Sequence, residues 1–166
     1  LLGEDAGDAV VSVMLVNNET GVIQPVRAIA DMVHEAGGLM HVDAIQAVGK
    51  MPVNIGQLGA DMLSVSGHKF GAPAGVGALV TRPGLNLAPR IVGGGQERRQ
   101  RAGTENISCI NAMGVVSRVV SKEMDWVDQA RLQRDVLESA LLSSGYDVVI
   151  FGSESDRIGT TCCFGV

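Results

Sequence analysis

The chain has 166 residues, of which 46% are hydrophobic and 19% charged, and its formal net charge is −5. These proportions are those of an ordinary globular protein, and the negative charge argues against general nucleic-acid binding. No segment approaches the ~18 uninterrupted apolar residues of a membrane span. Three cysteines without a CxxC pair indicate neither a disulfide framework nor a metal site, and we expect a cytoplasmic protein with reduced thiols.

Strand and helix patterns alternate along the first half of the chain. Residues 9–16 form a short apolar run rich in β-branched side chains, which predicts a buried strand. Residues 26–37 carry apolar side chains at helical spacing and end at a glycine pair, which predicts a helix. The pattern then predicts strands at residues 39–44, 61–67 and 76–82, with a short helix or turn at 54–60. Apolar strands that alternate with helices indicate an α/β fold whose sheet is covered on both faces.

The second half of the chain has a different character. Residues 91–106 form a glycine-rich, basic segment, and residues 107–144 form a helical stretch with breaks. Residues 146–152 and 160–166 predict two strands separated by a turn. Because the chain ends inside the second of these strands, we expect it to be a fragment of a longer protein.

Polar residues gather at the ends of three predicted strands, at Asn17–Asn18, Asp43–Gln46 and Ser66–Lys69. Ligands of α/β sheets collect at strand ends and in the loops that follow them. A lysine placed there can act as a nucleophile toward a carbonyl group, and a neighbouring carboxylate can hold a protonated pyridine nitrogen. Asp43 and Lys69 therefore fit a pyridoxal phosphate site, although many α/β proteins carry an aspartate and a lysine at strand ends.

Four longer strings are more specific: VNNETG, HVDAIQAVGK, SGHKFGAPAGVGAL and GGGQERRQRAGTEN. In this order they resemble the cysteine desulfurase and selenocysteine lyase family, within the class-V aminotransferase group of fold-type-I pyridoxal phosphate enzymes. The resemblance covers nearly the whole chain. It implies that residues 1–115 form the C-terminal part of the cofactor-binding large domain, with a mostly parallel sheet flanked by helices. Residues 116–166 would form a linking helix and the start of a small α+β domain.

The resemblance also implies which residues bind the ring of the cofactor. Lys69 would carry pyridoxal phosphate and act as the catalytic residue. Asp43 would pair with the pyridine nitrogen, where the alternative for this residue is a helix N-cap. Gln46 would contact the phenolic oxygen, and Asn18 would lie beside the ring.

Three further residues would contact phosphate groups. The resemblance implies this role for Ser66 and His68 in the same chain, and the alternative for His68 is a hydrogen-bonded core histidine. Thr104 would reach the phosphate of the cofactor in the other subunit, so the full-length protein would be a homodimer.

The implied activity is pyridoxal-phosphate-dependent removal of sulfur from L-cysteine, or of selenium from L-selenocysteine. The products would be L-alanine and an enzyme-bound persulfide, which passes to an iron–sulfur scaffold protein or another sulfur acceptor. The family's catalytic-cysteine loop is not recognisable in the chain, so we expect the fragment alone to be inactive. The alternatives are a selenocysteine lyase, another class-V enzyme such as an aminotransferase or a kynureninase-like hydrolase, and a non-catalytic remnant that serves as a binding or scaffold protein.

Overall fold

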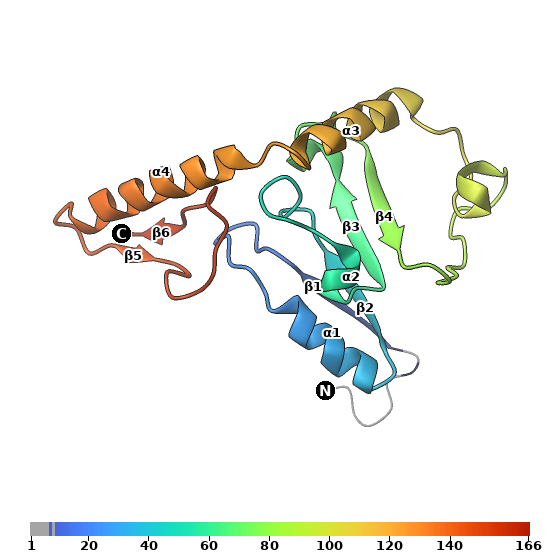
Figure 1. Ribbon diagram of the computed structural model, residues 1–166, viewed down its shortest axis with the longest axis horizontal. Coiled ribbons are helices and arrows are strands. Elements are labelled where there is room, and N and C mark those ends of the chain that lie inside the picture. The colour runs from blue at the N-terminus through green and yellow to red at the C-terminus, as the bar shows by residue number, and fades with distance from the viewer. Residues whose placement is uncertain (1–6, 8) are drawn as a thin grey trace.

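The computed structural model describes Gly7 and residues 9–166, and a four-stranded sheet lies at its centre (Figure 1). The strands follow one another in chain order across the sheet, and they are β1 (Val10–Met14), β2 (Leu39–Asp43), β3 (Met62–Ser66) and β4 (Gly77–Thr81). The first three strands run parallel, and β4 is antiparallel to β3. The predicted α/β fold with a mostly parallel sheet is therefore confirmed.

Helix α1 (Val26–Glu35) packs against one face of the sheet. It begins directly after Pro25, whose fixed φ suits a helix start. It ends at Glu35, two residues before Gly37, which has a φ of +80°. There the N–H of Gly37 donates to the carbonyl of His34, and the N–H of Gly38 donates to that of Val33. These two bonds form a Schellman motif, which explains why the helix ends at the glycine pair.

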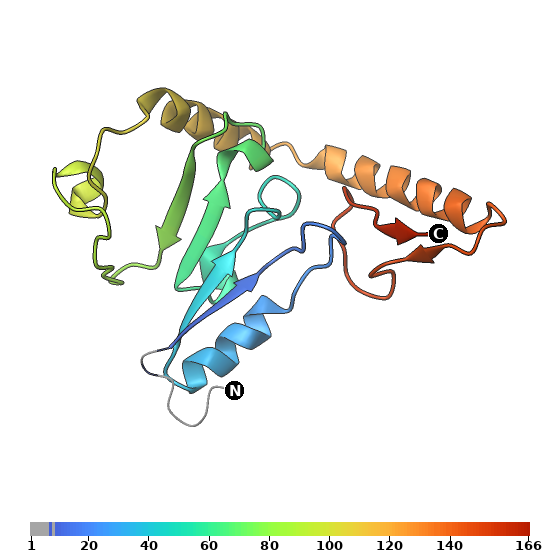
Figure 2. The same cartoon turned by 180° about the vertical axis from the view of Figure 1, so that it is seen from behind.

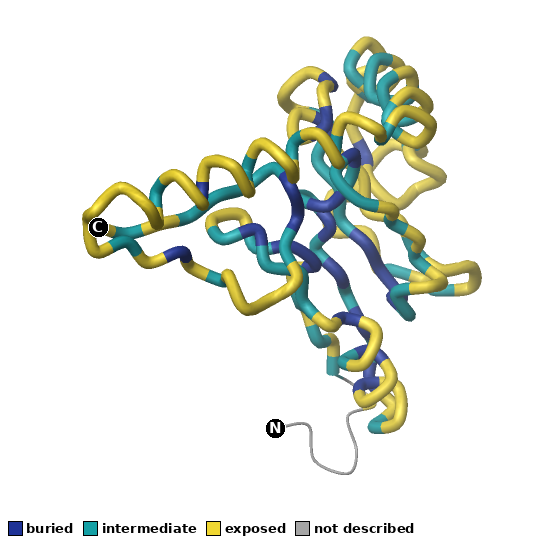
Figure 3. Tube along the Cα trace, turned by 60° about the vertical axis from the view of Figure 1, so that its left-hand side comes forward, coloured by how far each residue is buried: buried dark blue, intermediate teal, exposed yellow. Residues whose placement is uncertain are grey.

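The hydrophobic core lies between α1 and the sheet, where Figure 3 shows the buried segments gathered. Its fully buried side chains with the largest volumes are Leu15, Val26, Val33, Met40 and Val42. Burying each such side chain contributes about 1.5 to 3 kcal/mol, so this face supplies much of the folding free energy.

The opposite face of the sheet carries polar side chains together with exposed apolar ones, such as Val10, Met14 and Leu79. On this face the imidazole of His41 hydrogen-bonds to Ser12 on β1 at 2.7 Å and to Ser64 on β3 at 2.8 Å. Along β1 the exposed residues alternate with half-buried ones, so only one side of that strand packs into the core. The carboxyl end of this face carries Met14 and Asp43, which are register partners.

The remaining helices are short or lie at the periphery of the sheet (Figures 1 and 2). They are α2 (Ile55–Leu58), α3 (Ile107–Val120) and α4 (Asp125–Leu142), with 3₁₀ turns η1 (Gly67–Lys69) and η2 (Gln96–Arg99). The break between α3 and α4 falls at residues 121–124, whereas the predicted domain boundary between residues 115 and 116 lies inside α3. That boundary stays a prediction. Within the described part of the chain, no helix is long and apolar enough to cross a membrane.

Residues 125–166 form a second unit, in which α4 lies beside a two-stranded antiparallel sheet (Figure 2). The two strands are β5 (Val149–Ile150) and β6 (Phe164–Gly165), each much shorter than predicted. The turn between them pairs instead with the loop after β1. Ile23 donates its N–H to the carbonyl of Asp156, and Ile158 donates its N–H to that of Gly21. These bonds attach the second unit directly to the loop that carries Asn18.

A buried ion pair fixes this turn against α4. The guanidinium of Arg157 donates two hydrogen bonds to the carboxylate of Glu138, at 2.7 and 2.8 Å. The Arg157 hydrogen bonds hold the pKa of Glu138 below its ordinary value, against the opposing effect of burial. Arg134, one turn earlier on α4, donates to the carbonyl of Ile158 at 3.0 Å. The second unit therefore depends on a polar network as well as on apolar contacts.

A second buried carboxylate, Asp61, joins elements at the amino end of β3. It accepts a hydrogen bond from the N–H of Met40 at 2.7 Å and one from His34 at 2.9 Å, and it forms an ion pair with Arg82. Burial acts to raise the pKa of Asp61, but these hydrogen bonds and positive charges outweigh it and lower the pKa. The side chain of Asp61 thus links α1, β2 and the end of β4.

We predict that Asp61→Ala lowers the free energy of unfolding by about 2 to 3 kcal/mol, because the buried N–H of Met40 loses its acceptor. Urea denaturation measures this change. The control is Asp31→Ala, which removes an exposed pair with Arg27 on α1 and should leave stability unchanged within error. Equal effects of the two substitutions would contradict the assignment.

The same residue predicts a pH dependence. Because the pKa of Asp61 is lower in the folded state, its stabilisation is present above about pH 4, the ordinary value for an aspartate, and is lost as the pH falls through the folded pKa. The stability difference between the wild type and Asp61→Asn should therefore shrink in acid.

Candidate functional site

A cavity of about 220 Å³ opens at the carboxyl ends of β1 and β2. It is lined by Met14, Val16, Asn18, Asp43, Ile45 and Gln46. The cavity is smaller than the ~300 Å³ at which typical small-molecule sites begin, so it is a small site. The structure thus brings together three of the residues predicted from the sequence, Asn18, Asp43 and Gln46.

The two asparagines after β1 have different roles. The side-chain oxygen of Asn17 accepts hydrogen bonds from the N–H groups of Glu19 and Thr20, both at 2.9 Å. This is an Asx-type turn, which shapes the loop. Asn18 is exposed and lines the cavity. The first asparagine therefore supports the loop, and the second is available to a ligand.

Asp43 is the last residue of β2 and is half-buried. Its Oδ1 accepts a hydrogen bond from the N–H of Ile45 at 2.9 Å. Among the hydrogen bonds of the described residues, none reaches Oδ2. One carboxylate oxygen at the cavity can therefore accept a proton-bearing nitrogen from a ligand.

Gln46 follows in the turn after β2 and is bonded to a lysine that sequence reasoning did not single out. The ammonium of Lys50 donates to Oε1 of Gln46 at 2.7 Å. Burial lowers the pKa of Lys50, and the positive charge of Lys69 lowers it further. Lys50 and Lys69 therefore lie within electrostatic range of each other. The sequence signal that could have indicated this bond is the spacing of four residues between Gln46 and Lys50, which places two side chains on the same side of a helical turn.

The end of β3 and the turn η1 carry three more of the predicted residues, Ser66 on the strand and His68 and Lys69 in the turn. Ser66 Oγ and His68 Nδ1 are hydrogen-bonded at 3.0 Å, and His68 and Lys69 are exposed. Gly67 is buried, and a Cβ there would lie only 2.9 Å from a methyl group of Val76. A glycine is therefore needed here because the chain packs closely against Val76 just before Lys69.

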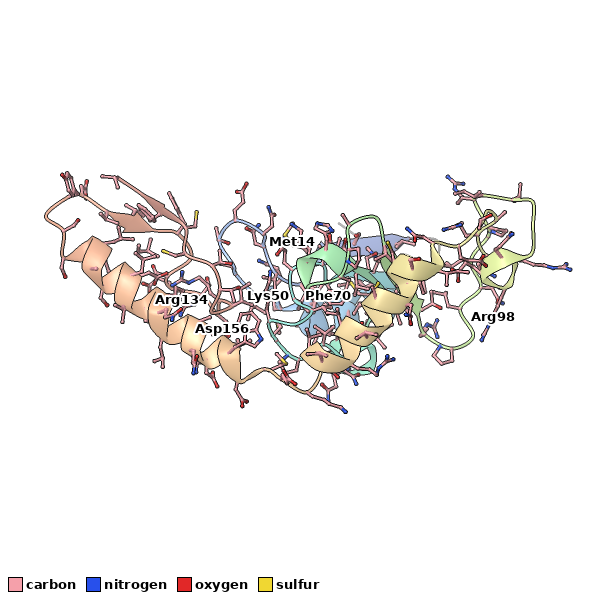
Figure 4. The ribbon with its side chains drawn as sticks, turned by 90° about the horizontal axis from the view of Figure 1, so that it is seen from above. Met14, Lys50, Phe70, Arg98, Arg134 and Asp156 are labelled. Atoms are coloured by element: carbon pink, nitrogen blue, oxygen red, sulfur yellow. The ribbon has the colours of Figure 1, made fainter. Side chains whose placement is uncertain are left out.

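Thr104 is not brought to this cavity. It is exposed in the segment between η2 and α3. Figure 4 shows Arg98 of η2 far from Met14 and Lys50. The backbone of Glu97, Arg98 and Arg99 has positive φ values, from 47° to 67°, so this segment adopts a left-handed turn without glycine. The predicted contact of Thr104 with the other subunit's cofactor stays a prediction.

The described residues contain a second, larger hollow of about 730 Å³ between α4 and residues 159–162. Trp126 and Cys162 line it, and the residues predicted for the site do not. The functional groups thus gather at the strand ends and not at this hollow.

The residues at the strand ends fit pyridoxal phosphate by their chemistry. Asp43, which has one carboxylate oxygen without a hydrogen bond among the described residues, lines the cavity together with Gln46. A hydroxyl, an imidazole and an amine follow at the end of β3 and in η1, at Ser66, His68 and Lys69. Lys69 does not line the cavity, but its charge acts on the Lys50 ammonium that is bonded to Gln46.

Comparison with known proteins places this arrangement in a family. The family model for aminotransferase class-V matches residues 5–166. A cysteine desulfurase of Gluconacetobacter diazotrophicus is 46% identical over 154 residues, which are 92% of this chain and 38% of the relative. The chain therefore spans less than half the length of that relative.

Solved structures agree with this result. The NifS-like protein from Rickettsia africae has a TM-score of 0.84 and 31% identity, over 90% of this chain and 42% of that protein. SspA in complex with cysteine has a TM-score of 0.63 and 38% identity, over 66% of this chain and 32% of that protein. The resemblance read from the four sequence strings is confirmed, and the chain belongs to the aminotransferase class-V family, with cysteine desulfurases among its relatives.

Proposed function

We propose that the full-length protein is a pyridoxal-phosphate-dependent cysteine desulfurase that converts L-cysteine to L-alanine and retains the sulfur as a persulfide. The observation that carries the proposal is the meeting of Asp43, Asn18 and Gln46 in one cavity, next to strand β3, which leads into the turn that carries Lys69. The 46% identity to a protein named cysteine desulfurase supports the substrate, as does the likeness to a structure that contains cysteine.

Bound pyridoxal phosphate supplies a ring that withdraws electrons from the α-carbon of an amino acid. Asp43 holds the proton on the ring nitrogen through its free carboxylate oxygen, and this keeps the ring electron-withdrawing. Lys69 would hold the cofactor covalently through its amine, and the same amine would serve as the base that moves the proton of the substrate's α-carbon.

The other predicted residues bind and orient. Gln46 donates to the phenolic oxygen, and Asn18 limits the ring on its side of the cavity. Ser66 and His68, which already share a hydrogen bond, contact the phosphate. Thr104 contacts the phosphate bound to a second copy of the protein, so the proposed enzyme is a homodimer.

The sulfur-accepting thiolate is proposed to lie outside residues 1–166. Burial raises the pKa of the Cys162 thiol, and the negative charge of Glu138 raises it further. A thiol that is held protonated in this way is a poor nucleophile. Its position beside α4, away from the Asp43 cavity, also separates it from the substrate.

We predict that Lys69→Ala in the full-length protein abolishes the visible absorption of covalently bound pyridoxal phosphate and reduces activity by at least about 10³-fold, since the variant has no amine at this position. Absorption spectra after dialysis and an alanine assay measure both. Lys122→Ala is the matched control, because Lys122 is exposed and follows α3. Persistence of the absorption in Lys69→Ala would show that another amine carries the cofactor.

We predict a different result for Asp43→Asn, which keeps the shape of the side chain but removes its charge. The cofactor should still bind, while turnover falls by about 10²-fold or more, because the ring nitrogen loses the anion that keeps it protonated. Steady-state alanine formation measures the loss, with Asp31→Asn on the exposed face of α1 as control. Near-normal turnover would contradict the role given to Asp43.

A further inference from the structure

Lys50 is a half-buried cation that the proposed function does not use. Its ammonium bonds to Gln46 at 2.7 Å. Among the ion pairs of the described residues, none includes Lys50. The charge of Lys69 and partial burial both disfavour its charged form and lower its pKa. A cation placed here without a carboxylate partner is unfavourable for folding, which points to a role at the cavity.

The bond between Lys50 and Gln46 determines which end of the amide enters the cavity. An ammonium group has three donors and no acceptor, so only the carbonyl oxygen of Gln46 can face it. The amide nitrogen must then be directed away from Lys50. Because Gln46 lines the cavity, that nitrogen is the end available to a ligand there.

We propose that Lys50 is a positioning residue, which holds the carboxamide of Gln46 with its NH₂ group toward the bound ring so that it donates a hydrogen bond to the anionic phenolic oxygen. This inference rests on the proposed function. Without Lys50 the amide can rotate by 180° and present its oxygen, which an anionic oxygen repels. The phenolic oxygen would then lose both its hydrogen-bond donor and a nearby positive charge.

Lys50 could instead serve only to stabilise the turn after β2. The N–H groups of Lys50 and Met51 both donate to the carbonyl of Ala47, so the backbone there is already hydrogen-bonded. A structural role would change the melting temperature and leave the spectrum of the bound cofactor unaltered. A positioning role changes the spectrum and the affinity for the cofactor.

The test compares Lys50→Met, which keeps the length of the side chain without a donor, with Lys50→Arg, which keeps donors and charge. Both are made in the full-length protein, with Lys122→Met as control. We expect the apparent dissociation constant for pyridoxal phosphate to rise about 3- to 10-fold in Lys50→Met, as for one lost hydrogen bond, and to be largely restored in Lys50→Arg.

The pH titration of the absorption of the bound cofactor gives the second readout. Its midpoint should move upward in Lys50→Met, because the anionic oxygen loses a donor and a neighbouring cation. Asp43 and Lys69, the other charged groups beside the cavity, are unchanged in these variants. In a Gln46→Ala background, Lys50→Met should produce much less additional change, since both substitutions act through one amide.

The outcomes separate the inference from the proposed function. If the cofactor absorption depends on Lys69 but Lys50→Met leaves the cofactor spectrum and the dissociation constant unchanged, the inference is overturned and the proposed function stands. Fully additive effects of Lys50→Met and Gln46→Ala would overturn it too. If the cofactor absorption is absent from the wild type or persists in Lys69→Ala, both the inference and the proposed function are overturned.

A further variant keeps the inference testable if Lys50→Met fails to fold. Gln46→Glu creates an ion pair with Lys50 but removes the NH₂ donor. It should raise the melting temperature or leave it unchanged while weakening cofactor binding at least threefold. Unchanged binding in Gln46→Glu would contradict the inference.

Discussion

The parallel pairing of β1, β2 and β3 is the constraint on which the candidate site depends. Parallel strands bring their carboxyl ends to one edge of the sheet. Met14 is the register partner of Asp43, and Asp43 is that of Ser64. The backbone continues this ladder, because Leu15 donates to the carbonyl of Asp43 and Ala44 donates to that of Ser64. Three polar loops distant in sequence therefore emerge side by side.

The two faces of the sheet have different roles: one contributes stability, and the other leads to the candidate site. One face packs Met40 and Val42 against α1 in a fully buried core. The other carries Ser12, His41 and Ser64 in a hydrogen-bonded row that ends near the Asp43 cavity. The buried carboxylate of Asp61 fixes the amino end of β3, opposite the end that carries the turn with Lys69. Substitutions at Asp61 and at Lys69 should thus affect stability and chemistry separately.

Much of the first half of this fold was predictable from the sequence, for local reasons. The Val-rich run at Val10–Met14 and the helical spacing that ends at Gly37 depend on near neighbours in the chain. A strand was predicted at residues 146–152, but the short extent of β5 (Val149–Ile150) was not, because the residues that follow it pair with the loop at Gly21. That pairing depends on contacts between residues more than 130 positions apart, which periodicity does not register.

The candidate site was predicted in its residue types but not in its hydrogen bonds. The motif string contains Asn17 beside Asn18, and only the structure separates the loop-forming residue from the one at the cavity. His34 is exposed on α1, and no sequence pattern indicated that its Nε2 bonds to the buried Asp61. Lys50 lies in the HVDAIQAVGK motif, but no role was predicted for it, because its partner is the amide of Gln46 and not a charged group.

Chemical trapping of the cofactor tests the central claim most directly. The full-length protein is incubated with pyridoxal phosphate, reduced with borohydride and digested, and the modified lysine is located by mass spectrometry. The account predicts a single modified residue at Lys69, although Lys50 lies within electrostatic range of it and has the lowered pKa that favours a reactive amine. Modification at Lys50, or spread over Lys50, Lys69 and Lys122, would contradict it.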